Sequence, residues 1–406
     1  MKRVVITGLG VVSSIGIGKD EFWANLIKGK SGISKIDAFD TSDPLNYPTQ
    51  FGGQVKNFKP EDFIDRRKKD LLGRSSQLAI AAAKLALKDA GLLKDLNTIS
   101  DKVGINIGTT MGETINIEQI DSVWGKEGEG RVDVRLISRY PSNVLSMNVG
   151  IELNLKGSNF VFPTACAAGN YAIGYSYDQI CSDDLIMIAG GADAFSRIAF
   201  TGFNRLYAMA PEMCQPFDKN RKGMLLGEGA GMVVLESLES AEKRGANIYA
   251  EVLGYGLSCD AHHMTQPQEE GVAKCMTKAM DEAGISIDDV DYISAHGTGT
   301  PQNDKVEVSA IRKVFGAKYK KIPVSSIKSM LGHPMGAGAA IEAIACCLAI
   351  KDGVLPPTIN YETPDSECDI DCVPNKARKQ KVSIILNNSY AFGGNNACLV
   401  LRKYND

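Results

Sequence analysis

Three sequence features occur twice, in the same order, along this chain of 406 residues. Each set begins with a β-branched strand that runs into Gly-x-Gly. It continues with an alanine-rich helical stretch closed by Ala-Gly and then a strand closed by Gly-Thr. The first set is VVITGLGVVSS, QLAIAAAKLALKDAGL and KVGINIGTTMG, and the second is AEVLGYGLSCD, VAKCMTKAMDEAGI and VDYISAHGTGT. The repetition predicts a duplicated αβ unit, and therefore an α/β protein whose helices cover largely parallel or mixed sheets.

The two copies are expected to differ in length. The Ala-Gly stops, Gly91 and Gly284, lie further apart than the late glycine turns, Gly229 and Gly393. The first copy therefore has additional residues, which we expect at about 112–160. We place the junction near Gly254, which predicts an N-terminal half at 1–254 and a C-terminal half at 255–406. Because no low-complexity linker separates them, the halves should pack as one body.

Composition excludes several classes of function. The net charge of −3 argues against nucleic acid as a partner. No apolar stretch approaches the roughly 18–20 residues that cross a membrane, and the glycine-studded N-terminus is unlike a signal peptide. The ten cysteines show no disulfide-framework spacing, and CDIDC has neither a histidine nor a second cysteine pair nearby. We therefore expect a cytoplasmic protein without a membrane segment or a metal site.

Nucleotide-binding motifs are also missing from the sequence. GLGVVS and GYGLSC each follow a strand, but both lack the third glycine of G-x-G-x-x-G. No G-x-x-x-x-G-K-[ST] occurs. Neither a dinucleotide nor a nucleoside triphosphate is predicted to bind here.

Cys166, in FPTACAAGN, has the most unusual surroundings of the cysteines. NFVFPTAC is typical of a strand and AAGNYAIGYSYDQI of a helix, so the thiol should lie at a strand-to-helix turn beside the first free amide N–H groups. The helix dipole and these donors stabilise a thiolate, which predicts a lowered thiol pKa and a nucleophile. The alternative is a small buried thiol that fills a tight turn.

Two of the four histidines lie in glycine-rich turns. His296 closes the apolar strand in VDYISAHGTGT, and His333 precedes an alanine-rich helix in SSIKSMLGHPMGAGAAIEA. Catalytic side chains of αβ proteins gather at such strand ends. His262 and His263 lie in a polar stretch, where a solvated or loop-ordering role is expected. We interpret His296 and His333 as candidates to act with Cys166.

Four motifs together, TACAAG, HGTGT, SSIKSMLGH with GAGAAIEA, and FGGNN, closely resemble the type II β-ketoacyl-[acyl-carrier-protein] synthases. The resemblance spans essentially the whole chain. It implies the thiolase-like fold, with two βαβαβαββ halves in a five-layer α-β-α-β-α sandwich, usually as a dimer. It also implies an acyltransferase that condenses malonyl thioesters by decarboxylation, on substrates that acyl carrier protein holds through phosphopantetheine, without a cofactor.

The resemblance also implies roles for individual residues. Cys166 would carry the acyl chain, while His296 and His333 would stabilise the enolate that forms as CO₂ leaves. The backbone N–H groups of Cys166 and Phe392 would form the oxyanion hole. Lys328 would orient the histidines with support from Glu342, or the two form a buried ion pair only. The remaining implied contacts are Thr298 and Thr300 with the pantetheine arm, Phe392 as an aromatic gate, and Met111 and Phe203 along the acyl tunnel.

Basic residues cluster in DRRKKDLLGR, at Arg66, Arg67, Lys68 and Lys69. A charge run is often only a solvated face. In the family, however, the corresponding region meets the acidic carrier protein, so electrostatic docking is the favoured interpretation.

Alternatives to an active condensing enzyme fit the motifs less well. A non-catalytic chain-length partner subunit would lack the nucleophile, and Cys166 is present. Thiolases and type III condensing enzymes use other residue sets, and the second histidine in LGHPMGAG argues against them.

Within the favoured class, Gln215–Asp218 (QPFD) replaces the Arg-Pro-Trp-Asp common in housekeeping enzymes. The sequence therefore leans towards the ketosynthase α subunit of a type II polyketide synthase, paired with a homologous chain-length factor. A homodimeric fatty-acid β-ketoacyl synthase II is the alternative.

Overall fold

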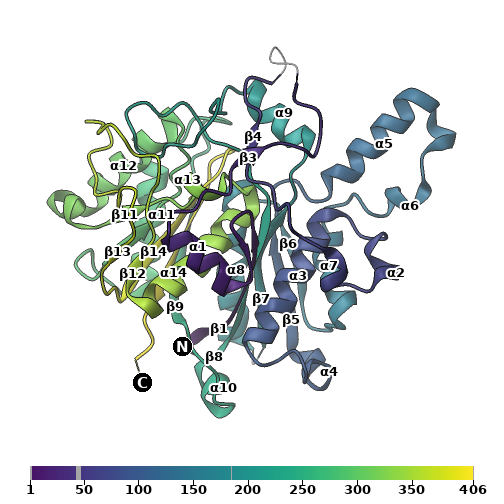
Figure 1. The fold of residues 1–406 in the computed structure, drawn as a ribbon. Coiled ribbons are helices and arrows are strands. Elements are labelled where there is room, and N and C mark those ends of the chain that lie inside the picture. The colour runs from purple at the N-terminus through teal and green to yellow at the C-terminus, as the bar shows by residue number, and fades with distance from the viewer. Residues whose placement is uncertain (1, 43–46, 184, 406) are drawn as a thin grey trace.

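The two copies form the two halves of one sheet. The computed structural model describes residues 2–42, 47–183 and 185–405 (Figure 1). From one edge to the centre, the sheet contains β11 (Val324–Ser325), β10 (Tyr292–Ser294), β14 (Ile384–Tyr390), β15 (Asn395–Arg402) and β9 (Ala250–Cys259). From the centre to the other edge it contains β1 (Val4–Ser13), β8 (Gly229–Ser237), β7 (Ile186–Asp193), β5 (Val103–Gly108) and β6 (Asn159–Phe162).

Strand directions repeat in the two halves. The first strand of each half pairs antiparallel with the last, as β1 does with β8 and β9 does with β15. The next pairs, β8 with β7 and β15 with β14, are also antiparallel. The outer strands are parallel in both halves. The halves meet where β1 and β9 pair antiparallel. The duplicated thiolase-like α/β fold predicted from the sequence is confirmed.

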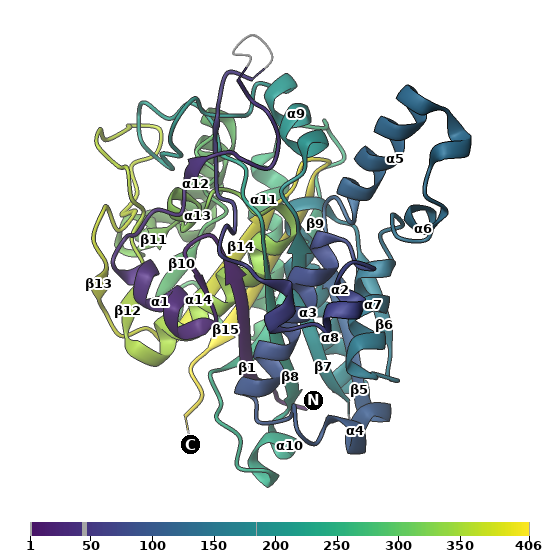
Figure 2. The same ribbon diagram turned by 45° about the vertical axis from the view of Figure 1, so that its right-hand side comes forward.

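The two halves of the sheet form two of the five layers, and helices form the other three (Figures 1 and 2). Between the two halves lie α8 (Ala168–Ser182) and α14 (Gly338–Asp352), which contact each other. Residues 338–350 of α14 are all buried, as expected for a helix apolar on every side. The outer layer of the first half contains α3 (Arg74–Asp89) and α7 (Val144–Leu153), and that of the second half contains α11 (Glu269–Ala283) and α12 (Pro301–Phe315).

The remaining elements connect these layers. The helices are α1 (Lys19–Ile27), α2 (Arg66–Lys69), α4 (Leu96–Ile99), α5 (Thr114–Glu127), α6 (Val134–Ile137), α9 (Arg197–Arg205), α10 (Leu238–Lys243) and α13 (Lys328–Leu331). The short strands are β2 (Gly16–Ile17), β3 (Ser34–Lys35), β4 (Phe51–Gly52), β12 (Val354–Leu355) and β13 (Arg378–Lys379). The 3₁₀ segments are η1 (Pro60–Asp62), η2 (Ser100–Lys102), η3 (Glu129–Arg131), η4 (Ala165–Ala167), η5 (Gly316–Lys321) and η6 (Met335–Ala337).

Segment 112–160, where the sequence predicts the additional residues, contains α5, η3, α6 and α7 between β5 and β6. The corresponding connection from β10 to β11 contains only α12 and η5. Figure 2 shows α5 and α6 projecting from the side of the first half. The predicted boundary at residue 254 lies inside β9, so a division just before that strand would keep it whole. No helix in the described part of the chain is long and apolar enough to cross a bilayer.

The Gly-x-Gly repeats place helices directly against strands. A Cβ atom on Gly10 of β1 would lie 1.9 Å from the carbonyl oxygen of Ala82 in α3. In the second half, a Cβ on Gly256 of β9 would lie 2.2 Å from the carbonyl oxygen of Cys275 in α11. These glycines therefore allow close packing of a helix on a strand, a role that needs no nucleotide.

Replacing Gly10 with Ala should lower stability substantially, because the methyl group cannot fit unless α3 moves away from β1. We expect a loss of at least about 2 kcal/mol in the free energy of unfolding, measured by urea denaturation. Gly125→Ala in α5 is the control, because a Cβ there meets open space. The control should be neutral or stabilising by up to about 1 kcal/mol. Equal effects of the two substitutions would contradict this account of the packing.

Candidate active site

The fold places Cys166 and His333 on equivalent turns of the two halves. Cys166 lies in η4, which leads into α8, and His333 lies just before η6, which leads into α14. Each 3₁₀ turn begins with a residue in the left-handed region, Ala165 at φ 50° and Met335 at φ 49°. Such backbone strain in non-glycine residues is characteristic of functional sites. The duplication thus brings two matching strained turns together at the start of the central helices.

Hydrogen bonds from the second half fix the turn that carries Cys166. Ser389 Oγ in β14 donates to the Cys166 carbonyl oxygen over 2.7 Å. One turn further along α8, the Asn170 amide donates to the backbone carbonyl of Asn387, and the Asn387 amide donates to Asn170 Oδ1. The position of the thiol therefore depends on both halves.

His296 follows β10, the strand equivalent to β5, at the strand end where the sequence predicts it. The backbone N–H groups of His296 and Gly297 donate to the two carboxylate oxygens of Glu307, each over 2.8 Å. Glu307 belongs to α12 and is fully buried. Sequence reasoning missed this residue, because a single glutamate inside a helical segment gives no distinctive pattern.

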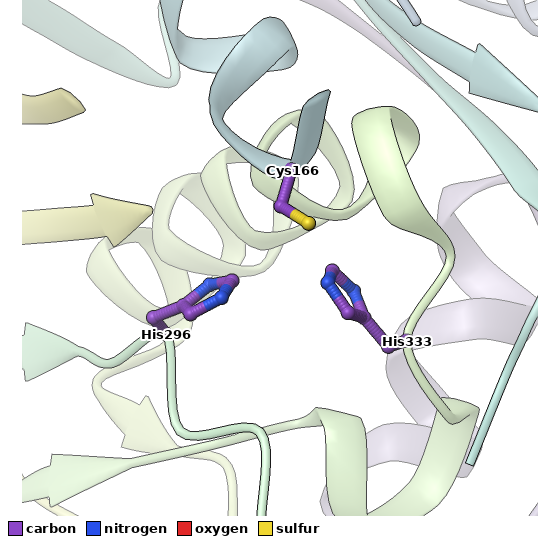
Figure 3. A group of neighbouring side chains, drawn as sticks. All are labelled: Cys166, His296 and His333. Atoms are coloured by element: carbon purple, nitrogen blue, oxygen red, sulfur yellow. The ribbon is translucent and has the colours of Figure 1, made fainter. Parts of the chain in front are cut away.

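Three side chains meet in this site. The Cys166 sulfur and a ring nitrogen of each histidine lie within 4.8 Å of one another. Figure 3 shows the sulfur pointing between the two rings, which come from opposite sides. The rings pack edge to face with centroids 5.3 Å apart. The backbone of His333 is held by Leu225, whose carbonyl accepts its N–H. The expected association of Cys166, His296 and His333 is thus present as a buried cluster.

Both histidines are neutral at physiological pH. Burial lowers the pKa of His296 and of His333 well below 6.5, and the charge of Lys328 lowers both further. His333 adds a smaller effect on His296. A neutral imidazole has one N–H to donate and one lone pair to accept. The site therefore contains two uncharged groups that can each hold or release a proton.

The predicted lowering of the thiol pKa is wrong for the substrate-free protein. Burial raises the pKa of Cys166 to about 12, and the carboxylate of Asp193 adds to that effect. The charge of Lys328 and the backbone N–H groups of Phe392 and Cys166 lower it only in part. The donors expected from the sequence are present, but loss of hydration outweighs them. Cys166 therefore rests as a protonated thiol.

Lys328 and Glu342 form a buried ion pair below the cluster. Lys328 begins α13 and Glu342 lies in α14, so the pair joins the loop before His333 to the helix after it. Burial raises the pKa of Glu342 to about 7, against the opposing charge of Lys328. This geometry fits both alternatives left open by the sequence, the orienting role and the ion pair.

A cavity of about 240 Å³ opens onto the cluster. Besides the cluster itself, its lining includes Thr298, Thr300, Phe203 and Phe392. The threonine hydroxyls lie 3.0 Å apart. The rings of Phe203 and Phe392 lie 5.9 Å apart and tilted. Met111 is instead part of the adjoining apolar cluster with Phe195 and Phe200.

Two other predicted groups lie apart from the cluster. The basic residues 66–69 form α2 and are exposed or nearly so. Arg67, Lys68 and Lys69 pair there with Asp65, Glu152 and Glu61. His262 and His263 are exposed, and His263 reaches the mouth of the cavity.

Asp193 is a second buried carboxylate that sequence reasoning missed. It ends β7 and accepts four hydrogen bonds, from the Thr109 hydroxyl and from the backbone N–H groups of Thr110, Met111 and Gly336. It thereby joins the end of β5 to the turn after His333. Burial raises its pKa to about 6. Its place at the end of the segment IAGGAD was the only sequence signal.

Comparison with known proteins agrees with this geometry. The sequence models "Beta-ketoacyl synthase, N-terminal domain" and "Beta-ketoacyl synthase, C-terminal domain" match residues 1–241 and 249–362. The chain belongs to the β-ketoacyl synthase family. The 3-oxoacyl-[acyl-carrier-protein] synthase 2 of Staphylococcus aureus (strain COL) is 43% identical, covering 99% of both chains. The enzyme of the same name from Coxiella burnetii is 42% identical, covering 100% of this chain and 99% of that one. This synthase is therefore a condensing acyltransferase with β-ketoacyl-ACP synthase activity.

Solved structures of two ketosynthases and of a β-ketoacyl synthase resemble this synthase. "The ishigamide ketosynthase/chain length factor" has a chain that is 45% identical, with a TM-score of 0.95 and full coverage of both chains. A β-ketoacyl synthase from Burkholderia phymatum STM815 is 34% identical, with a TM-score of 0.91 and full coverage. A ketosynthase in complex with a type II polyketide acyl carrier protein, AntDE:AntF, is also 34% identical, with a TM-score of 0.91, covering 99% of this chain and 100% of that one.

Alkylation of Cys166 by iodoacetamide should rise about tenfold for each pH unit between about pH 7 and 10. The reactive thiolate is a small fraction of a thiol whose pKa is raised to about 12. The rate is measured by mass spectrometry of the Cys166 peptide. A short unstructured cysteine peptide is the control, and its rate should bend near its thiol pKa of about 8.5 and level off about one pH unit higher. A plateau near neutral pH for Cys166 would instead show a thiolate–imidazolium pair in the resting protein.

Proposed function

We propose that this synthase condenses malonyl-ACP with an acyl chain carried on Cys166, using His296 and His333 for decarboxylation. The observation that supports this most strongly is the buried thiol facing two neutral imidazoles at the end of one cavity. A thiol supplies the covalent carrier, and two uncharged N–H donors supply stabilisation for a developing oxyanion.

In the first half-reaction, Cys166 accepts the acyl chain from acyl carrier protein. Its proton passes to a neutral imidazole in the cluster, and the sulfur attacks the thioester carbonyl. The backbone N–H groups of Cys166 and Phe392, which lower the pKa of the Cys166 thiol, stabilise the oxyanion. The carbonyl–sulfur bond to the carrier then breaks, and the departing pantetheine thiol takes the proton.

In the second half-reaction, the two histidines hold the malonyl thioester oxygen through their ring N–H groups. As CO₂ leaves, negative charge develops on that oxygen and both hydrogen bonds strengthen. The enolate carbon attacks the acyl carbonyl, the bond to Cys166 breaks, and the departing thiolate takes a proton from solvent. Lys328, held by Glu342, lowers the pKa of both rings and so keeps them as neutral donors.

The other cavity residues bind substrate in this proposal. Thr298 and Thr300 hydrogen-bond the pantetheine arm, and Phe392 acts as an aromatic gate against Phe203. Met111 and Phe203 border the acyl chain, with Met111 acting through the apolar cluster behind the cavity. No step requires a cofactor, because the pantetheine belongs to the carrier-bound substrate. The cytoplasmic location stays a prediction from the sequence.

The pathway has two candidates. Fatty-acid elongation is favoured by the curated relatives, which are 3-oxoacyl-[acyl-carrier-protein] synthases 2 at 42–43% identity over nearly the full length. The polyketide assignment, towards which the QPFD segment leans, is supported by the 45% identity to a chain of the ishigamide ketosynthase/chain length factor. We place fatty-acid elongation first. Product analysis with this synthase alone, and again with a homologous chain-length subunit, separates the two.

A homologous subunit is expected to pair with this synthase, either a second copy or a chain-length factor. Strand β6 is at one edge of the sheet. Phe160 on β6 is 45% exposed and Ile151 on the neighbouring α7 is 69% exposed. Phe160 packs edge to face on Tyr175 of α8. An exposed apolar edge strand favours pairing with another chain, and we assign this edge to the dimer.

Substitution of the cluster should separate the two half-reactions. Cys166→Ser should abolish acyl transfer to the protein, measured as the mass shift after incubation with acyl-ACP. His296→Ala and His333→Ala each leave a second imidazole to accept the thiol proton, so both should still be acylated. Their CO₂ release from malonyl-ACP should fall by on the order of 10²-fold or more, because an oxyanion donor is lost.

His262→Asn, at an exposed histidine outside the cavity lining, is the control for these variants and should match the wild type in both assays. Formation of β-ketoacyl product by Cys166→Ser at the wild-type rate would rule out the proposed nucleophile.

Charge reversal at Arg66 and Arg67 should raise the KM for acyl-ACP several-fold at low salt and flatten its salt dependence, while kcat changes little. Opposite charges on the carrier protein and on α2 mainly speed the diffusional encounter of the two proteins. Lys376 and Lys379, which are exposed at and beside β13, are the control pair for reversal. Equal KM changes for both pairs would show a net-charge effect and would remove α2 from the docking proposal.

A further inference from the structure

The cluster of Cys166, His296 and His333 has the composition of a metal site. One sulfur and two ring nitrogens, all buried, lie within 4.8 Å of one another. They come from three separate loops, each fixed by hydrogen bonds to other elements. In Figure 3 the three side chains converge on one point between them.

Ring nitrogens of both histidines lack partners. Nδ1 of His296 and both ring nitrogens of His333 are buried without a hydrogen bond in the described structure. Both side chains are at most 3% exposed. Buried polar atoms are almost always satisfied in proteins, so unsatisfied ring nitrogens on both histidines indicate a ligand. Imidazole nitrogen is a common metal ligand, and one ring nitrogen of each histidine lies within 4.8 Å of the Cys166 sulfur.

We propose that Cys166, His296 and His333 bind Zn²⁺, and that the ion inhibits the enzyme by occupying the catalytic cluster. One thiolate and two imidazoles are ligands that zinc prefers, and Mg²⁺ and Ca²⁺ prefer oxygen. The three side chains line the cavity, from which water can supply a fourth ligand. In a tetrahedral zinc site, ligand atoms lie roughly 3.3–3.7 Å apart. The ring and thiol rotamers therefore need to close by only about 1 Å.

The charges around the cluster permit Zn²⁺ to bind there. On binding, the S–H bond of Cys166 breaks, a sulfur–zinc bond forms, and the proton leaves to the buffer without electron transfer. Lys328 is the nearby cation and would oppose Zn²⁺. Its charge is offset by the ion pair with Glu342, whose second oxygen is unpartnered in the described structure, and the carboxylate of Asp193 also acts on Cys166.

The consequence for catalysis rests on the proposed function. A zinc-bound sulfur cannot attack a thioester, and rings that bind zinc cannot hold the malonyl oxygen. One ion therefore blocks both half-reactions. An acyl group on Cys166 removes the thiolate ligand, so zinc and acyl-ACP should compete for the enzyme.

The test uses reduced, metal-free, full-length protein and Co²⁺ as a spectroscopic probe. Binding should give a near-ultraviolet thiolate-to-cobalt charge-transfer band at one equivalent, and Zn²⁺ should displace it. Cys166→Ser should lose the band, and zinc affinity should fall on the order of tenfold or more in Cys166→Ser, His296→Ala and His333→Ala. Cys259→Ser and His262→Asn, at exposed positions, are the matched controls and should retain both the band and the affinity.

Iodoacetamide-treated wild-type protein provides a second blocked form that does not depend on a variant folding, and it too should lose the band. Mg²⁺ should neither compete with Co²⁺ for the cluster nor inhibit the enzyme. Absence of the band in wild type, or unchanged zinc affinity after Cys166 is blocked or replaced, would overturn the proposal. Loss of zinc affinity in His262→Asn alone would place the ion on the surface instead, and this result too would overturn the proposal.

These binding measurements need no carrier-bound substrate, so they stand apart from the condensing assay. Zinc binding without condensation would overturn the proposed function only, and condensation without zinc binding would overturn the metal site only. With both present, inhibition by Zn²⁺ should be competitive with acyl-ACP and reversed by EDTA.

Discussion

The whole site depends on how closely α8 and α14 pack at their first turns. A Cβ atom on Gly169 of α8 would lie 2.8 Å from the backbone nitrogen of Ala340 in α14. A Cβ on Gly191 of β7 would lie 2.3 Å from the carbonyl oxygen of Gly336. Because small residues occupy these positions, the two turns approach backbone to backbone. That approach brings a thiol from one half within reach of imidazoles from the other.

Burial at this contact sets the electrostatics of the site. The same loss of water that raises the pKa of Cys166 lowers the pKa values of both histidines. All three side chains are therefore uncharged until substrate arrives. Two buried carboxyl groups, Asp193 and Glu307, hold backbone N–H groups in place, and burial raises their pKa values to about 6 and about 7. The loops are thus positioned by fixed hydrogen bonds, and the reacting groups stay free to exchange protons.

Much of this arrangement could be predicted from the sequence, because it follows from local patterns. The repeated glycine turns and Ala-Gly stops predicted the duplicated fold, and the helices end where expected, with Gly91 and Gly284 in the left-handed region just after α3 and α11. The motifs likewise predicted that Cys166, His296 and His333 would meet.

Properties that arise only from packing could not be predicted. The helix-dipole argument for Cys166 considered its own turn, whereas its pKa is set mainly by atoms from both halves. Asp193 and Glu307 are single carboxylates in ordinary strand and helix segments, so no spacing marks them. Met111 packs on an apolar cluster that adjoins the cavity through Phe203, and its contact with an acyl chain stays a prediction.

The matching strained turns at Ala165 and Met335 have a consequence for how such a site can arise. A single αβ unit possesses one turn of this kind, with a side chain at its tip and nothing opposite. It gains a facing turn only by meeting another copy of itself across a two-fold axis, where both tips would be identical. When the two copies are joined in one chain, the two facing turns no longer need to have the same residues. The side chains on the two turns can then differ, as Cys166 and His333 do, which they cannot in a symmetric pair of identical units.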